Sequence, residues 1–485
     1  MARLKKLNFL VLILAGAATE IVYFLIARTP DLRINIPRFL IYYGILFAIY
    51  WLSARRFFDF NKPRGNDVHQ STLSKNQVLL IGVIFGILFR LTMLVSQPSL
   101  SDDVYRYLWD GRVAAHGINP YQYPPAADEL ADLRDDQIYP RINHKEIPTV
   151  YPPVNQLFFA AIYKIHPSVT ALKAALVGFD LLTVAILLLM LRRLGINLRR
   201  GLIYAWNPLV IIEFSGSGHI DILGIFFLSL SLWLFFRNKF HASNIALALS
   251  FLTKFFTVVI WPVLFLLKKN RKEVAIIFSL LVVMLYLPYV DAGGGLFSGL
   301  LTYSEKWQFN DSIFALIFEK IKPMLPESLI YLLMLLPYGY YPDATTLHTR
   351  GIDLALNISK IIVGLIFSGV FFYFVKRLQT DLQREGQPWI AKLGLILMGS
   401  FFLLSPTLQP WYLCWLLPFL VISPNRAWLL LTGLIGFSYW TLIEYAKSGI
   451  WQEPLWVKFV EYAPFYFILI SDYLKSRRQT EMVKS

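Results

Sequence analysis

Apolar runs and short polar connections alternate along the whole chain. Most runs approach the roughly 20 residues that an α-helix needs to cross the hydrocarbon core of a bilayer. This pattern predicts an all-α polytopic membrane protein with about 12–14 transmembrane helices. The chain shows no internal repeat and no separate soluble domain, so residues 1–485 are expected to form one integral membrane domain. The expected spans are 7–27, 38–53, 77–96, 169–191, 201–213, 219–236, 273–290, 352–375, 389–404, 411–422, 427–446 and 455–474.

Three further apolar segments do not fit a simple crossing. Residues 153–165 are too short to span upright, and residues 327–338 are expected at the outer surface. Residues 243–267 are long enough to span, yet basic residues flank them on both sides. If both flanks are cytoplasmic, the segment is a re-entrant hairpin that breaks near "LTKFF", where protein or a wet cavity must shield the backbone.

Charge sets the orientation of this bundle. The chain is 56% hydrophobic and 16% charged, with a mean hydropathy of +0.53 and a formal net charge of +15. In a soluble protein such an excess of basic residues would suggest nucleic acid, but here they cluster in short connections, as cytoplasmic loops do. We therefore expect a multi-pass protein of the cell membrane with both termini in the cytoplasm and no nucleic-acid partner. The first apolar run is too long for a cleaved signal peptide and is interpreted as a span.

The long loop 97–152 is expected on the extracytoplasmic face, and it holds nine of the 31 acidic residues. Within it, "SDDVYRYLWDGR" begins a predicted amphipathic helix over 101–116, with Ser101 as its N-cap and Gly117 after its C-terminus. The spacing of Asp103, Arg106 and Asp110 places them on one helix face. The sequence thus predicts an acidic helix at the outer membrane surface.

An ionised carboxylate at this position suits one chemical task. It can take the proton of an acceptor hydroxyl as that hydroxyl attacks a lipid-linked donor. It could instead ligate a divalent metal, Mg or Mn, that bridges to a phosphate, or simply cap the helix. Tyr121, Tyr123 and Tyr151 offer stacking faces and hydroxyls to a sugar, although tyrosines also mark membrane interfaces.

These residues resemble a known family. "SDDVYRYLWDGRVAAHGINPYQY" followed by "YPPVNQ" resembles the first outer loop of GT-C superfamily glycosyltransferases, in particular bacterial polyprenyl-phosphate-mannose-dependent mannosyltransferases. "SPTLQPWYLCWLLPF" (405–419) resembles their late span with its Pro-Trp-Tyr. The resemblance implies a GT-C-like bundle with an outward-facing site. It also implies an inverting hexosyltransferase that moves a hexose, with mannose favoured, from a polyprenyl-phosphate donor to a hydroxyl of a glycolipid, polysaccharide or protein.

The resemblance also suggests site residues. Asp103, directly before "VYRY", is the first candidate for the catalytic base, and Asp102 is the second because adjacent acids leave the register open. The spaced Asp-X-Asp of some relatives is absent, so no metal ligand is assigned. The predicted substrate-binding residues are Arg106, Asp110, Arg112, Tyr121, Tyr151, His219, Asp221, Lys254, Gln409, Trp411 and Tyr412.

Each basic candidate has a structural alternative. Arg106 and Arg112 could bind phosphate bidentately, or pair with Asp103 or Asp110 on the helix. Lys254 is an ionisable group at membrane depth and so a functional candidate, but it could also snorkel or pair with an acid such as Glu213. His219 could contact phosphate or sugar, or belong to a capped turn.

Two other functions compete with a glycosyltransferase. A transporter or flippase of lipid-linked sugars predicts paired broken helices in two related halves, whereas the sequence shows one candidate broken helix without a partner. A glycan ligase or polymerase would use the same transferase chemistry, and the sequence does not separate it. The concentration of acids in an outer loop favours the glycosyltransferase.

Overall fold

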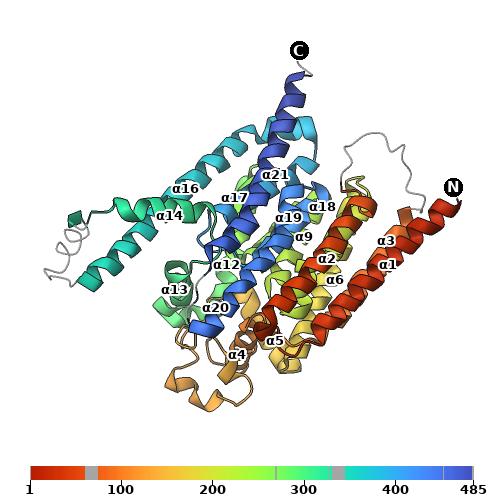
Figure 1. Cartoon of the computed structure of the whole chain (residues 1–485). Coiled ribbons are helices and arrows are strands. Elements are labelled where there is room, and N and C mark those ends of the chain that lie inside the picture. The colour runs from red at the N-terminus through yellow and green to blue at the C-terminus, as the bar shows by residue number, and fades with distance from the viewer. Residues whose placement is uncertain are drawn as a thin grey trace. The chain divides into compact units, whose positions relative to one another are not determined.

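The computed structural model describes residues 2–60, 75–267, 270–326, 328–329, 344–449, 451 and 453–482 (Figure 1). Among these residues, seven helices are long and apolar enough to cross a membrane, and five apolar helices are shorter. This confirms the predicted all-α polytopic membrane fold. The number of crossings stays a prediction, because length and composition alone do not place a helix across a bilayer. Lys62, Arg64, Lys268, Lys269 and most of the predicted surface piece 327–338 lie outside the described residues.

The chain forms two compact units, which are described separately. The second unit, Trp307–Gln409, contains α14 (Ile313–Ile321), α16 (Ala344–Glu385) and α17 (Pro388–Leu404). Its core packs Phe314 and Phe318 against apolar residues of the two longer helices. The backbone of Phe309 bonds Pro406 O at 3.0 Å, which joins the two ends of the unit. This division concerns compactness alone, so the single catalytic domain stays a prediction.

The first unit, Met1–Lys306 and Pro410–Ser485, contains the predicted loop and all helices discussed below. Its expected early spans are present as continuous helices. They are α1 (Ala2–Ala27), α2 (Ile36–Phe57), α3 (Lys75–Leu94) and α6 (Val169–Arg193). The C-terminal span is α21 (Leu455–Met482), and the span before it is divided into α19 (Arg426–Leu434), a 3-10 turn and α20 (Thr441–Ser448).

Side-chain contacts show which connections of the first unit share an end of the bundle. At one end, Arg33 between α1 and α2 donates Nε–H to Ser99 O of the acidic loop (residues 97–152) at 3.1 Å. At the other end, Arg200 after α6 lies 3.3 Å from Asp59 after α2. Arg193 there donates to Phe236 O at 3.0 Å. The acidic loop and the arginine-rich connections therefore lie at opposite ends, as the predicted alternation requires.

The predicted span 201–213 is wrong as a continuous helix. The structure has α7 (Gly201–Ala205), a break before Pro208, α8 (Pro208–Val210) and a π-helical turn over Ile211–Gly216. Proline supplies no backbone N–H to the helix ladder, and here the helix breaks before Pro208. Asn207 caps the new start, because its Oδ1 accepts the backbone N–H of Leu209 at 3.0 Å. π-Helical turns often occur at functional sites, and this one carries Glu213.

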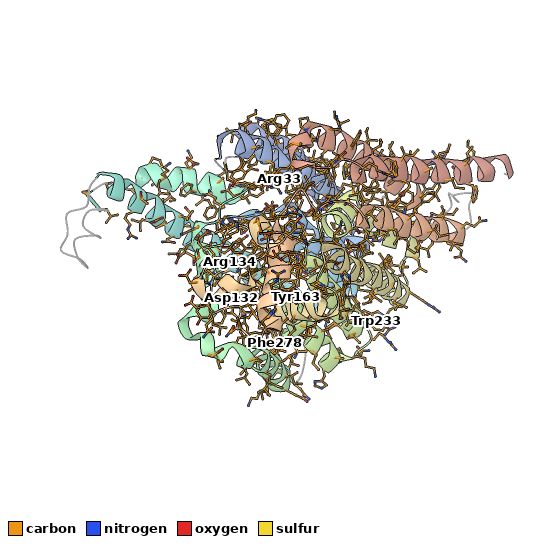
Figure 2. The ribbon with its side chains drawn as sticks, turned by 90° about the horizontal axis from the view of Figure 1, so that it is seen from below. Arg33, Asp132, Arg134, Tyr163, Trp233 and Phe278 are labelled. Atoms are coloured by element: carbon orange, nitrogen blue, oxygen red, sulfur yellow. The ribbon has the colours of Figure 1, made fainter. Side chains whose placement is uncertain are left out.

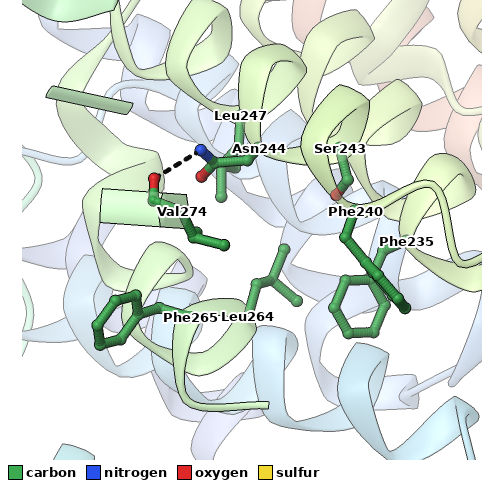
Figure 3. A pocket seen from close by; sticks show the side chains of 8 residues that line it. All are labelled: Phe235, Phe240, Ser243, Asn244, Leu247, Leu264, Phe265 and Val274. Carbon is green, nitrogen blue, oxygen red and sulfur yellow. Dashed lines mark hydrogen bonds between the residues drawn. The ribbon is translucent and has the colours of Figure 1, made fainter. Parts of the chain in front are cut away.

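The predicted break near "LTKFF" is confirmed. The segment contains α10 (Phe240–Phe251), a non-helical tip at 252–254, a 3-10 turn and α11 (Trp261–Leu266). Trp261 donates to Asn244 Oδ1 at 3.2 Å, and Asn244 donates to Val274 O of α12 (Arg271–Tyr286) at 2.8 Å. Figure 3 shows a small apolar pocket around these ends, lined by Phe235, Phe240, Ser243, Asn244, Leu247, Leu264, Phe265 and Val274. Both arms therefore meet at one end, and the segment is a hairpin; its placement in a bilayer stays a prediction.

The predicted loop helix is α4 (Asp103–Ala115), which begins two residues later than expected. Asp102 rather than Ser101 occupies the N-cap position and makes no capping bond, because its carboxylate is held elsewhere. Gly117, with φ +78°, follows the helix as predicted. α5 (Pro153–Ile165) packs on α4 so closely that a Cβ on Gly111 would lie 2.5 Å from Phe159 O.

A carboxylate cluster as candidate active site

The two adjacent acids of the loop face different partners. Asp102 Oδ1 accepts a bond from Arg33 at 2.6 Å, and both side chains are 31% exposed. Asp103 Oδ2 lies 3.7 Å from His219 Nδ1, and its side chain is 23% exposed. Asn143 of the same loop donates to Asp103 Oδ1 at 3.4 Å. The two carboxylates therefore have different contacts: Asp102 pairs with Arg33, whereas Asp103 faces His219.

His219 lies between two carboxylates. Its Nε2 is 3.3 Å from Glu213 Oε2, and the ring stacks on Trp411 with centroids 3.7 Å apart. Glu213 Oε1 accepts a bond from Tyr439 OH at 2.7 Å. The preceding Gly218 has φ +76°, a conformation that favours glycine, and it brings the histidine under the loop helix. The structure thus places the predicted phosphate or sugar contact beside acids.

Lys254 pairs with Asp221, the first residue of α9 (Asp221–Phe236). Its Nζ lies 2.8 Å from both carboxylate oxygens, and Trp415 Nε1 donates to Asp221 Oδ1 at 2.7 Å. The ammonium also lies 4.2 Å from the centre of the Tyr412 ring. The predicted alternative of a pair with an acid is confirmed, although Glu213 was the wrong partner. The helix N-terminus adds to the stabilisation of the Asp221 carboxylate.

The hairpin tip reaches the acidic loop through the "YPPVNQ" motif. The backbone N–H of Val154 donates to Leu252 O at 3.2 Å. The buried Asn155 donates Nδ2–H to Thr253 O at 2.7 Å. The tip is not helical, so its carbonyls need these partners. Lys254 follows directly, and the loop motif therefore positions the lysine of the site.

Aromatic residues cover the same region. The "PWYLCWL" stretch, predicted as the start of a span, is a 3-10 helix over Pro410–Leu416 that continues into α18 (Leu417–Ile422). Tyr412 OH bonds Tyr303 OH of α13 (Ser298–Lys306) at 2.8 Å. Phe256 contacts the Tyr412 and Trp415 rings edge-on. Gln409, the remaining predicted residue of this motif, belongs to the second unit.

The buried acid of α4 forms an internal network. Arg106 Nε donates to Asp110 Oδ1 at 2.8 Å, which is the ion pair given above as the alternative to phosphate binding. Thr149 donates its hydroxyl to Asp110 Oδ2 at 2.6 Å, and Gln156 donates to Thr149 Oγ1 at 2.8 Å. The network ties α4 to Thr149, two residues before the "YPPVNQ" motif, and to Gln156 at the end of the motif. It therefore stabilises the loop. We assign Arg106 and Asp110 to this network and propose no substrate contact for them.

Arg112 fastens the outer part of the loop. It donates to Leu133 O at 2.8 Å, bonds Tyr163 OH at 3.2 Å and pairs with Asp135. Burial opposes ionisation of Asp135, but the bonds from Arg112 and from backbone N–H groups outweigh it and lower its pKa to about 2. Figure 2 shows this face from below, with Asp132, Arg134 and Tyr163 labelled. The contacts again hold the loop together.

The two predicted sugar-binding tyrosines also have structural contacts. Tyr121 donates its hydroxyl to Tyr151 O at 2.7 Å. The Tyr151 ring packs edge-on against Tyr107 of α4, with centroids 5.1 Å apart. Tyr107 stacks in turn on Phe159 at 4.9 Å. These aromatic contacts join the loop to α4 and α5.

Sequence reasoning missed two buried ionic features. Glu213 was considered only as a partner of Lys254, although an acid inside an apolar run is itself a functional signal. The same signal is present at Arg90 of α3 and Asp180 of α6, which the sequence-based predictions do not include. Both are fully buried, with Arg90 Nε 2.7 Å from Asp180 Oδ2. Tyr204 donates to Asp180 Oδ1 at 2.9 Å, which locks α7 against the pair.

Comparison with known proteins identifies a family. The sequence model of a family described as alpha-(1->6)-mannopyranosyltransferase, N-terminal domain, matches residues 24–269, just over half of the chain. The matched range contains Asp103, Glu213, His219, Asp221 and Lys254. No curated protein and no solved structure matches the chain.

Proposed function

Because the chain belongs to the alpha-(1->6)-mannopyranosyltransferase family, glycosyltransferases that move mannose, we propose that it takes mannose from a polyprenyl-phosphate donor. The acceptor is a hydroxyl of a glycolipid, a polysaccharide or a protein. Membership of this family supports transferase chemistry over the transporter alternative. The cluster of Asp103, Glu213, His219, Asp221 and Lys254 is then the site of transfer.

One observation carries this proposal: a carboxylate and an ammonium, each partly exposed, occur in the same cluster. The side chains of Asp103 and Lys254 are 23% and 21% exposed, and the two charges interact electrostatically. Lysine has three N–H donors, and Asp221 takes two of them. One donor of Lys254 therefore remains for a phosphate oxygen, while Asp103 can meet a hydroxyl.

The reaction follows from these two roles. The acceptor O–H donates to the Asp103 carboxylate, and its oxygen attacks the anomeric carbon opposite the phosphate. As the new C–O bond forms, the bond to the phosphate oxygen breaks and its electron pair leaves with the phosphate. Lys254 stabilises the charge that grows on that oxygen, and the proton ends on Asp103. In-line attack inverts the configuration of the sugar. We assign the neutralising charge to this lysine rather than to a metal ion.

We place the reaction on the extracytoplasmic face. The cluster lies at the end of the first unit that carries the acidic loop, whereas Arg193 and Arg200 lie at the opposite end. Arginine-rich connections are retained in the cytoplasm. With both termini on that side, a donor whose polyprenyl tail lies in the membrane can present its headgroup to the outer end.

The test uses purified protein in detergent micelles with added lipid, a polyprenyl-phosphate-mannose donor and a panel of mannose-containing acceptors. Asp103→Asn removes the base and should lower kcat by about 10²- to 10⁴-fold, the usual contribution of a general base. Asp102→Asn is the matched control, because the adjacent acid pairs with Arg33 instead. It should transfer mannose at close to the wild-type rate, because it leaves the base in place.

Two results would contradict the proposal. If Asp103→Asn transfers mannose at the wild-type rate, Asp103 is not the base. If the lipid donor is left intact while a nucleotide-linked mannose is consumed, the donor class is wrong.

A further inference from the structure

The ring of His219 is buried between two acids. Its Nδ1 lies 3.7 Å from Asp103 Oδ2 and its Nε2 lies 3.3 Å from Glu213 Oε2. The side chain is 1% exposed. Neither ring nitrogen has a hydrogen-bond partner of standard geometry, although both face a carboxylate. Burying polar atoms in this way is costly unless they bond, so the arrangement calls for an explanation.

The protonation state of the ring decides whether it fits. A neutral imidazole has one N–H donor and one lone pair, and only the protonated ring donates from both nitrogens. Both neighbours are carboxylates, which accept hydrogen bonds and donate none when ionised. A neutral His219 would therefore aim a lone pair at one of the acids. A protonated His219 satisfies both.

Two further features favour a cation at this position. The indole of Trp411 stacks on the ring at 3.7 Å, and an aromatic face attracts a cation. The cluster also holds three carboxylates, those of Asp103, Glu213 and Asp221, and the ammonium of Lys254 pairs with Asp221. A charge on His219 lowers this negative excess before an anionic phosphate enters.

The other ionisable groups near the ring and near Glu213 either bond elsewhere or are usually neutral at pH 7. Lys173 packs against Gly218 but donates its ammonium to Ser96 O at 2.6 Å. Asp221 is held by Lys254 and Trp415. Behind Glu213, Tyr439 donates to the carboxylate. Tyr43 and Cys414 also interact with Glu213 electrostatically, and both are neutral at pH 7 in their usual state.

We propose that Glu213 and His219 form a positioning pair for Asp103. Glu213, fixed by Tyr439, anchors the protonated ring through Nε2–H. The ring then donates Nδ1–H to Asp103 Oδ2 and leaves Oδ1 for the acceptor hydroxyl. This inference rests on the proposed role of Asp103 as the base. It adds a requirement that the base itself does not impose: the transfer must fail at alkaline pH, when His219 loses its proton.

The experiment is a pH profile of kcat/KM with the polyprenyl-phosphate-mannose donor between about pH 5.5 and 9, a range that spans the usual titration of histidine. The wild-type profile should fall on its alkaline side. His219→Gln keeps one amide donor that does not titrate, so the alkaline fall should disappear. Its kcat should drop by about a hundredfold, as expected for a misplaced catalytic group, while the donor KM changes little.

Glu213→Gln gives a second and milder variant. It keeps the shape of the side chain and removes one of the two charges that hold the proton on His219, so the alkaline fall should move to lower pH. His241→Gln is the matched control, because His241 also faces a glutamate, Glu273, at 3.7 Å but is exposed. Its profile should match wild type. Elution as a single micellar species and the thermal midpoint show whether each variant is folded.

The outcomes separate this inference from the proposed function. If Asp103→Asn is inactive but Glu213→Gln and His219→Gln keep the wild-type alkaline limb, the positioning pair is wrong and the base assignment stands. If His219→Gln does not fold, an unshifted alkaline limb in Glu213→Gln alone overturns the inference. If Asp103→Asn is fully active, the proposed function fails first.

Discussion

Variants of Lys254 can distinguish a charge that acts in catalysis from a charge that only stabilises the structure. Lys254→Met keeps the length of the side chain but removes the ammonium that lies 2.8 Å from both oxygens of Asp221. Asp221 is 1% exposed, so the variant leaves a buried carboxylate that still accepts the indole N–H of Trp415 but has lost its ion pair. Breaking one side of a buried ion pair costs about 3–5 kcal/mol. A loss of activity in this variant alone would therefore not distinguish the two roles.

The double variant Lys254→Met with Asp221→Asn makes that distinction. The asparagine is neutral, and its Oδ1 can still accept the indole N–H of Trp415. Most of the lost stability should return, because no buried charge is left unpaired. The activity should not return, since a donor aimed at developing charge contributes about 10²- to 10³-fold in kcat, or roughly 2.7–4 kcal/mol.

Two measurements decide the outcome. Thermal unfolding followed by tryptophan fluorescence compares the wild type, the two single variants and the double variant. Steady-state transfer from the lipid donor gives kcat and KM for each folded protein. If the double variant regains both the wild-type midpoint and the wild-type kcat, Lys254 serves only to balance Asp221, and the assigned phosphate contact is refuted.

Two other predictions follow from the buried charges and from the two ends of the first unit. Asp180→Leu should lower the thermal midpoint strongly, because it leaves the charge of Arg90 buried and unpaired. Adding Arg90→Met should restore the midpoint. Additive losses of stability in the double variant would contradict this account of the pair. In a Cys414→Ala background, Gln137→Cys should react with a membrane-impermeant maleimide on intact cells, and Lys239→Cys only after permeabilisation; the reverse pattern would place the acidic loop in the cytosol.

Much of the fold could be predicted from the sequence because the determining features are local. Helix length follows from the length of an apolar run, and the prediction of 153–165 matches α5 (Pro153–Ile165). The hairpin break near "LTKFF" followed from basic residues at both flanks. The break at Pro208 was readable from the proline and the capping Asn207, yet the hydropathy of 201–213 concealed it.

The candidate site was predictable only in part. The resemblance and the acidic loop pointed to Asp103, and an ionisable group in an apolar segment pointed to Lys254. The contact partners of these residues could not be predicted, because they come from distant parts of the chain. Glu213, Trp415 and Tyr439 reach the cluster only through packing, and nothing in their own sequence neighbourhoods names Asp221 or His219 as the group they contact.

The sequence by itself determined three features: a membrane bundle, an acidic loop at one end of it and a lysine inside an apolar segment. Only the tertiary structure decided which partner each of the two adjacent acids contacts. Asp102 is the N-cap residue and Asp103 is the first residue of α4, and their carboxylates contact different partners. Arg33 from the turn between α1 and α2 takes Asp102, and Asp103 is left facing His219. Which face meets which partner depends on how separate helices pack, and that information is spread over the whole chain.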